Sequence, residues 1–303
     1  MSAGASRART LAIVALFAGA TCIGTSALFV KVSEAGPVST AFWRVFLALP
    51  FLWAWTLAAN RNASRNAPHA VAPAPHNPRG LLFAAGFFFA GDLAVWHWSI
   101  VLTSVANAVL LANLAPIFVT LAAWLLWRNR PSLLFLTGLA AALTGVALMV
   151  GGDFSGSSSR ALLGDALGVV TAMFYAAYQV TVKKLRGTVN TARIMAVSSI
   201  VTAAILLPIA LLTGEVFFPV TATGWIKVLG LALISQVAGQ SLIAYALAHL
   251  PATLSSVGLL LQPVMAGMFA WILLGETLGA AAMVGAILVL IGIRVATQAD
   301  NRP

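Results

Sequence analysis

Hydrophobic residues gather in ten long runs that short polar segments separate. A helix rises 1.5 Å per residue, so roughly 20 mostly apolar residues cross a hydrocarbon core of roughly 30 Å. The runs therefore predict ten membrane-spanning helices, at residues 10–32, 38–59, 80–102, 104–127, 132–150, 162–183, 191–213, 224–248, 252–274 and 278–297. Helices are expected rather than strands, because an open sheet would leave backbone groups unpaired in lipid.

The chain contains a repeat. Four residues of one stretch, Pro116, Trp124, Gly138 and Gly145, recur 147 positions later as Pro263, Trp271, Gly285 and Gly292. At an offset of 152 positions, Lys31 falls on Lys183. Such self-similarity predicts a duplicated unit, with residues 1–150 as the first copy and 151–303 as the second. Each copy has five spans, an odd number, so the second copy is expected to cross the membrane upside down, with the substrate site between the copies.

Composition supports a lipid environment. Hydrophobic residues make up 61% of the chain and charged residues 8%, whereas a soluble domain carries about 25% charged residues. We expect a multi-pass integral protein of the cell membrane. The single cysteine, Cys22, lies in an apolar run and excludes a disulfide framework. His69 and His76 lie in the polar linker Asn60–Pro78 and are expected to be solvated; we predict no metal and no cofactor.

The basic residues predict the orientation. The net charge is +10. With the N-terminus in the cytoplasm, most of the 17 basic residues fall on the cytoplasmic side: Arg7, Arg9, Arg61, Arg65, Arg79, Arg128, Arg130, Lys183, Lys184, Arg186, Arg193, Arg294 and Arg302. The positive-inside rule therefore predicts that both termini are cytoplasmic. The clusters mark topology and contacts with lipid headgroups, and a nucleic-acid partner is not expected.

Two stretches carry a family resemblance. LLANLAPIFVTLAAWLLW and SVGLLLQPVMAGMFAWILLGETL resemble the paired fourth and ninth helices of the drug/metabolite transporter superfamily, EamA type. The second copy has the family's Gly275-Glu276 after the helix, where the first has Arg128-Asn129. The resemblance implies a ten-helix fold and a central cavity lined by helices one, three, four, six, eight and nine. It also implies a small metabolite, such as an amino acid, as cargo.

Two ionisable residues lie in the interior of predicted spans. Asp92 there costs about 2.5 to 3.5 kcal/mol on insertion scales, so it needs a partner or water. Asp92 is expected roughly 18 Å from the cytoplasmic side and Arg44 roughly 9 Å from the outside. In a hydrocarbon core of roughly 30 Å these positions are at about the same depth, and we predict that the two residues pair. The pair is either a structural salt bridge or a proton-binding site, with protons as coupling ion. His97 lies about 140° around the helix from Asp92 and is expected to be a satisfied interior histidine rather than a proton shuttle.

Further side chains within spans are candidates for the substrate cavity. They are Trp96, Asn113, Tyr175, Tyr178, Gln179, Gln236, Gln240, Tyr245 and Gln262. Gln236 and Gln240 are four residues apart and share a helix face. The alternative for the amides is hydrogen bonding between helices, at roughly 1 kcal/mol each, and for the aromatic residues it is packing.

Prolines and small residues predict local geometry. Pro116 and Pro263 are expected to bend their helices near the central site, either as hinges for transport or as static kinks. Small residues four apart, such as Gly138 and Ala142, predict close contact between span five and span ten. Both a monomer and a homodimer remain open.

The sequence therefore predicts a membrane carrier of a small organic metabolite, an amino acid or an amphipathic aromatic compound. It is expected to work by alternating access and to export its cargo. An importer or exchanger is the alternative. An intramembrane enzyme is a distant one, since it would need two cooperating groups at one depth. A channel would show a ring of charges.

Overall fold

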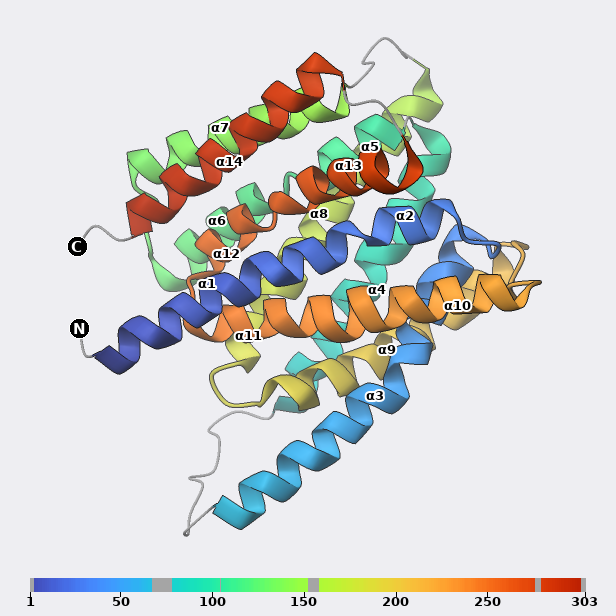
Figure 1. Ribbon diagram of the computed structural model, residues 1–303, viewed down its shortest axis with the longest axis horizontal. Coiled ribbons are helices and arrows are strands. Elements are labelled where there is room, and N and C mark those ends of the chain that lie inside the picture. The colour runs from blue at the N-terminus through green and yellow to red at the C-terminus, as the bar shows by residue number, and fades with distance from the viewer. Residues whose placement is uncertain (1–2, 67–77, 104, 152–157, 276–278, 301–303) are drawn as a thin grey trace.

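The computed structural model describes residues 3–66, 78–103, 105–151, 158–275 and 279–300. Within these ranges, ten helices are long and apolar enough to cross a membrane, as the hydrophobic pattern predicts. His69 and His76 lie outside the described residues. The two chain ends lie close together at one end of the bundle (Figure 1). We call this end termini-proximal and the opposite end termini-distal.

The bounds of the helices agree with the predicted spans, with three differences. Several spans are built from two or three segments, α1 begins at Ala3 instead of near residue 10, and α3 extends to Asn66 instead of ending near residue 59. The first half contains α1 (Ala3–Gly24), α2 (Ser26–Lys31), α3 (Pro37–Asn66), α4 (Pro78–Leu102), α5 (Val105–Ala112), α6 (Ala115–Trp127) and α7 (Leu133–Val150). The second contains α8 (Ser159–Leu185), α9 (Thr191–Leu212), α10 (Ala222–Leu231), the π-helix η1 (Ala232–Gln240), α11 (Ser241–His249), α12 (Ala252–Gly258), α13 (Leu261–Leu274) and α14 (Ala280–Asp300).

The surface is apolar where a soluble protein would be polar. Large hydrophobic side chains on the perimeter are widely exposed, including Leu133 at 82% and Leu212 at 87%. The interior, in contrast, holds hydroxyl and amide side chains such as Ser199 and Gln179. Lipid tails can cover this perimeter without loss, which water cannot, so the distribution is that of a membrane protein.

The predicted bends at Pro116 and Pro263 take the form of interrupted helices. The chain turns between α5 and α6 just before Pro116, and again between α12 and α13 just before Pro263. Each proline thus lies in the first turn of the following helix, where its missing N–H costs no hydrogen bond. At the first break, the Asn113 side chain donates to the Val109 carbonyl at 2.8 Å. The two breaks place helix ends in the middle of the bundle.

Helices α7 and α14 pack against each other along their glycines (Figure 1). A Cβ atom added to Gly145 would lie 2.6 Å from the Gly285 carbonyl oxygen, and one added to Gly292 would lie 2.6 Å from that of Gly138. The order of partners is reversed, so the helices are antiparallel. Close contact needs residues without a side chain at these positions, and the predicted contact between spans five and ten is confirmed.

Two glutamates cap helices across the halves at the termini-distal end. Glu215 of the second half accepts hydrogen bonds from the backbone N–H groups of Val38 and Ser39, at the start of α3 (3.0 and 3.3 Å). Glu34 of the first half accepts from the N–H groups of Val220 and Thr221 just before α10 (3.0 and 2.9 Å). A carboxylate at a helix N-terminus satisfies free N–H groups and interacts favourably with the helix dipole.

The turns after α6 and α13 differ in one residue type. Gly275 ends α13 with φ at +68° and Arg128 ends α6 with φ at +59°, and the two positions are related by the repeat. Arg128 is the one non-glycine residue with positive φ among the described residues. The left-handed conformation costs a non-glycine residue roughly 1–2 kcal/mol. Arg128 therefore adopts a backbone conformation in which a glycine would be less strained.

We expect Arg128→Gly to raise the free energy of unfolding. Relief of the left-handed strain, roughly 1–2 kcal/mol, exceeds the added entropy of an unfolded glycine, roughly 0.5–1 kcal/mol. The net gain is about 0.5–1 kcal/mol, which thermal unfolding of the purified protein in detergent would register as roughly 1–2 °C. Gly275→Ala, the matched change in the other copy, should lower the melting temperature. An Arg128→Gly variant that melts below the wild type would contradict the strain.

We expect Glu34→Gln to lower the melting temperature at neutral pH. Hydrogen bonds from Thr221 hold the pKa of Glu34 below its usual value of 4.5. A carboxylate with a lowered pKa stabilises the fold above its unfolded pKa, and this contribution is lost as the pH falls through the lowered value. The gap between wild type and variant should therefore close below pH 4.5. Melting curves of both proteins from neutral pH to below pH 4.5 test this prediction. A difference in melting temperature that does not change with pH would refute the role of the carboxylate.

Candidate functional site

Two adjoining cavities lie near the centre of the bundle. Cavity I has a volume of about 140 Å³ and cavity II about 170 Å³. Their walls share six residues: Ile23, Arg44, Leu93, Trp96, Val109 and Asn113. The two are therefore neighbouring parts of one central cavity, which is where a ligand site is expected in a helical bundle.

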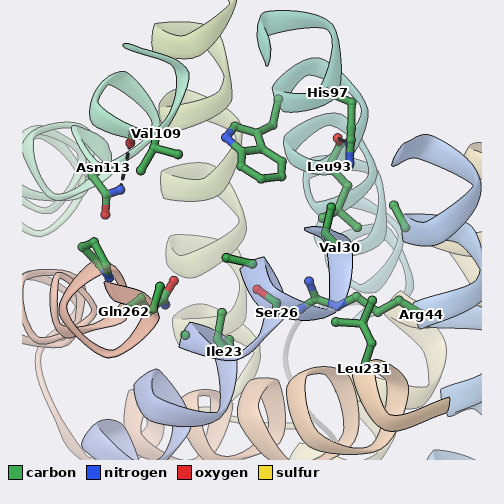
Figure 2. Close-up of a pocket in the computed structure, with 16 residues that line it drawn as sticks. Ile23, Ser26, Val30, Arg44, Leu93, His97, Val109, Asn113, Leu231 and Gln262 are labelled. Atoms are coloured by element: carbon green, nitrogen blue, oxygen red, sulfur yellow. Dashed lines mark hydrogen bonds between the residues drawn. The ribbon is translucent and has the colours of Figure 1, made fainter. Parts of the chain in front are cut away.

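The central cavity lies towards the termini-distal half. Arg44 comes near the start of α3, and Trp96 and His97 come near the end of α4, both at termini-distal helix ends. In Figure 2, Arg44 enters cavity I from one side, and Asn113 and Gln262 face it from the other. On the termini-proximal side, Phe89 stacks on Tyr178 with ring centroids 4.9 Å apart. Tyr178 is only 2% exposed, so this aromatic pair closes the cavity towards the termini.

Arg44 is held by the second half but is only partly satisfied. Its side chain is 7% exposed. Nε donates to Oε1 of Gln236 at 3.2 Å, and the guanidinium carbon lies 5.9 Å from the centroid of the Phe89 ring. Nη2 is buried and makes no hydrogen bond with a described residue. An arginine stays charged in proteins, so a buried donor with positive charge faces both cavities.

Asp92 lies in the wall of cavity II together with Arg44, but the predicted ion pair between them is wrong. Among the described residues, no hydrogen bond or ion pair reaches the Asp92 carboxylate. The reason is the direction of the arginine: its guanidinium is turned to Gln236 and to the Phe89 ring. The two residues line the same cavity, and their opposite charges act on each other through space without a hydrogen bond or ion pair between them.

His97 is bound at one nitrogen only. Its Nδ1 donates to the Leu93 carbonyl one turn earlier, since a carbonyl can only accept. Nε2 is buried and makes no hydrogen bond with a described residue. His97 lines cavity I and Asp92 lines cavity II, in agreement with their expected separation around the helix. Within the described chain there is no group of three metal-ligating side chains.

Most of the predicted site residues line the central cavity. They are Arg44, Asp92, Trp96, His97, Asn113, Tyr175, Gln240 and Gln262, together with Pro263. Tyr175 and Gln262 also contact each other, because Gln262 Nε2 donates to the Tyr175 hydroxyl at 3.4 Å. Pro116 lies outside both walls.

Four predicted residues do not line either cavity. Gln236 accepts a hydrogen bond from Arg44 Nε, and Tyr178 stacks on Phe89. Gln179 is 1% exposed, and neither its amide nitrogen nor its oxygen makes a hydrogen bond with a described residue. The ring of Tyr245 packs on that of His249 near the termini-proximal end of α11, with ring centroids 4.7 Å apart. Spacing along a helix cannot distinguish these positions from the cavity wall.

Thr171 is a wall residue that the sequence did not single out. It lies on α8 in cavity II, and its hydroxyl is buried without a hydrogen-bond partner among the described residues. The repeat offsets of 152 and 147 relate Thr171 to Gly19 and Asp92 to Gly239. Gly19 and Gly239 meet where α1 crosses η1: a Cβ atom on Gly19 would lie 2.9 Å from the Gly239 carbonyl oxygen. Glycines thus close the crossing of α1 with η1, whereas the repeat-related crossing of α8 with α4 carries the polar cavity wall.

The π-helix η1 carries two of the predicted amides. It includes Gln236, which binds Arg44, and Gln240, which lines cavity II. π-Helical turns are rare and occur frequently at functional sites, where they change the direction of side chains. The sequence gives no signal for this local change from an α-helix.

Comparisons with known proteins agree with this architecture. A model of the EamA-like transporter family matches residues 10–151 and 162–298. Two proteins of Archaeoglobus fulgidus, each described as an uncharacterized transporter, are 26% identical: one over 284 residues, covering 91% of this chain and 94% of the relative, the other over 282 residues, covering 93% and 94%. A solved structure titled only "Crystal structure of protein" has a TM-score of 0.78 and 20% identity, and the match covers 97% of this chain and 100% of the other. That likeness shows the fold.

We expect Asp92→Asn to stabilise the protein. A carboxylate in the bilayer interior costs about 2.5 to 3.5 kcal/mol on insertion scales, and the uncharged amide removes most of this cost. Thermal unfolding in detergent should show a higher melting temperature for the variant. Asp165→Asn is the matched control: Asp165 accepts from the Thr103 hydroxyl at 2.6 Å, so this variant should melt lower. A lower melting temperature for Asp92→Asn would show that the carboxylate has a partner.

Proposed function

The chain belongs to the EamA-like transporter family, and from this premise we propose that it carries a small zwitterionic metabolite, such as an amino acid, across the membrane. It is a multi-pass integral membrane protein and a transporter. The central cavity is the proposed substrate site. Alternating access, in which the two halves expose this cavity to one side at a time, is the proposed mechanism.

One observation carries the proposal for the substrate: Arg44 and Asp92 lie in the wall of one cavity and are not paired with each other. A buried charge without a partner is costly. A ligand that brings a carboxylate to Arg44 Nη2 and an ammonium group to Asp92 would remove both costs together. Charge-assisted hydrogen bonds of this kind contribute about 1.5–3 kcal/mol each.

The other wall residues favour a small ligand with an apolar or aromatic part. Trp96 lines both cavities and Tyr175 lines cavity II, and aromatic rings bury large apolar areas. Asn113, Gln240 and Gln262 supply amides for additional polar groups. The volumes of about 140 and 170 Å³ suit a metabolite rather than a peptide or a nucleotide.

We propose that both termini are cytoplasmic and that residues 1–150 and 151–303 are two repeats of opposite orientation. The positive-inside rule supports the orientation. The antiparallel packing of α7 on α14 through repeat-related glycines supports the repeat. In this orientation the cavity lies in the outer half of the membrane, above the Phe89–Tyr178 pair. Release to the outside, as in an exporter, is the direction we propose, and import or exchange is the alternative.

Protons are the proposed coupling ion, with Asp92 as their site. Support comes from the position of Asp92 in the wall of cavity II, since carboxylates inside membrane spans serve in proton relays. If transport depends on pH in the wild type, this dependence should be lost in Asp92→Asn.

Transport assays test the proposal. Cells that overexpress the protein should hold smaller internal pools of a zwitterionic metabolite, and labelled metabolite should cross proteoliposomes that contain it. Arg44→Gln and Asp92→Asn should each lower transport more than tenfold, because a lost charge-assisted contact is worth about 1.4 kcal/mol or more.

Gln179→Met is the matched control for these variants. It also removes a buried polar side chain, but one outside the cavity and without a hydrogen-bond partner among the described residues, so transport should remain near the wild-type rate. Equal losses in all three variants would point to general damage. Full transport in Arg44→Gln or Asp92→Asn would refute the assigned roles.

A further inference from the structure

A third pocket, of about 610 Å³, lies at the termini-proximal end and is separate from the central cavity. Its walls include Arg128, Arg130 and Ser132 from the turn between α6 and α7, and Phe135 on α7. Thr253 and Leu254 on α12 form the opposite wall. We call it the basic pocket. The first half of the chain contributes the arginines and the second half contributes the other wall, so the pocket lies between the halves.

We propose that the basic pocket binds the headgroup of an anionic phospholipid. Both arginines line it, and neither makes a hydrogen bond or ion pair with a described residue. No acidic side chain is among its described wall residues. Within the described wall, therefore, no acidic group compensates the two positive charges. Guanidinium groups bind phosphate oxygens well because they donate two parallel hydrogen bonds.

The depth of the pocket matches that of lipid headgroups. The 18 residues of α7 and the 21 residues of α14 span about 27 and 32 Å, close to the hydrocarbon thickness of roughly 30 Å. The pocket lies at the first turn of α7 and near Ala299, close to the end of α14. Trp124 and Trp127 are exposed beside it on α6, at 46% and 37%, as is typical of the membrane interface. Phe135 and Leu254 give the pocket an apolar side for the lipid's glycerol and first methylenes.

The strained backbone of Arg128 is an independent observation in favour of this site. The repeat-related position holds Gly275, which adopts the same left-handed conformation without strain. An arginine kept in a sparsely populated conformation indicates that its side chain has a use. The matching turn of the second copy continues with Glu276 in the sequence, so the two arginines are particular to the turn of the first copy.

A headgroup in the basic pocket would contact both halves at the end where the central cavity is closed. Opening of this end separates the α6–α7 turn from α12, because they form opposite walls. Anionic lipid should thus stabilise the closed arrangement, and the membrane's own composition would regulate the transporter. This inference is independent of the substrate proposed above.

Thermal unfolding in lipid nanodiscs tests the proposal without any transport assay. Phosphatidylglycerol added to phosphatidylcholine nanodiscs should raise the melting temperature of the wild type, and Arg128→Gly/Arg130→Gln should lose this rise. The double variant should still fold, since glycine relieves the strain at position 128, so its melting temperature in phosphatidylcholine alone reports an intact protein. Titration of bound phosphatidylglycerol by native mass spectrometry should show roughly fivefold weaker binding for each arginine removed.

Arg193→Gln is the matched control. Arg193 is exposed near the start of α9, at the same end of the bundle, and does not line the basic pocket, so this variant should keep the full rise. Millimolar inorganic phosphate without phosphatidylglycerol should leave the melting temperature unchanged. The proposal is overturned if the double variant keeps the rise, if the wild type shows none, if Arg193→Gln loses it equally, or if phosphate alone reproduces it.

Discussion

The distance at which helices cross in the centre of the bundle determines where the cavity lies. Where α1 of the first half crosses η1 of the second half, Gly19 and Gly239 touch, which leaves no space between the two helices. At the repeat-related crossing, Thr171 on α8 and Asp92 on α4 take these two places, and both line cavity II. Close packing without side chains is the main source of helix association in lipid, since lipid tails and leucine side chains are equally apolar. A duplicated unit can thus keep one crossing for stability and develop the other into a binding site.

Two groups of interior polar side chains differ in their hydrogen bonding. Thr202 and Ser99 donate to carbonyl oxygens of neighbouring helices and join them. Arg44 Nη2, His97 Nε2 and the Thr171 hydroxyl have no partner among the described residues and lie in the cavity wall. Unsatisfied buried groups lower stability, and proteins retain such costs where function requires them. Some buried groups outside the cavity walls, such as the Gln179 amide and the Ser255 hydroxyl, also lack a partner among the described residues. A missing partner therefore identifies the site only together with a place in the cavity wall.

The sequence predicts the spans well because lipid imposes a minimum length of apolar chain. The breaks before Pro116 and Pro263 and the glycine contacts of α7 with α14 also follow from local rules. The Arg44–Asp92 pair was predicted wrongly because rise per residue gives depth but not the direction of a side chain, which Gln236 and Phe89 determine for Arg44. For the same reason Gln179 and Tyr245 could not be told from wall residues. The π-helix η1 and the left-handed Arg128 depend on tertiary contacts and chain reversal, for which no local pattern exists.

The reciprocal caps at the termini-distal end have a mechanical consequence. Glu34 projects from the first half and holds the chain just before α10 in the second, while Glu215 projects from the second half and holds the start of α3 in the first. A tilt of one half against the other would therefore strain the hydrogen bonds of both glutamates. The two glutamate caps thus make it unfavourable for one side of the termini-distal end to loosen alone. This end should behave as a single cooperative unit with two discrete positions.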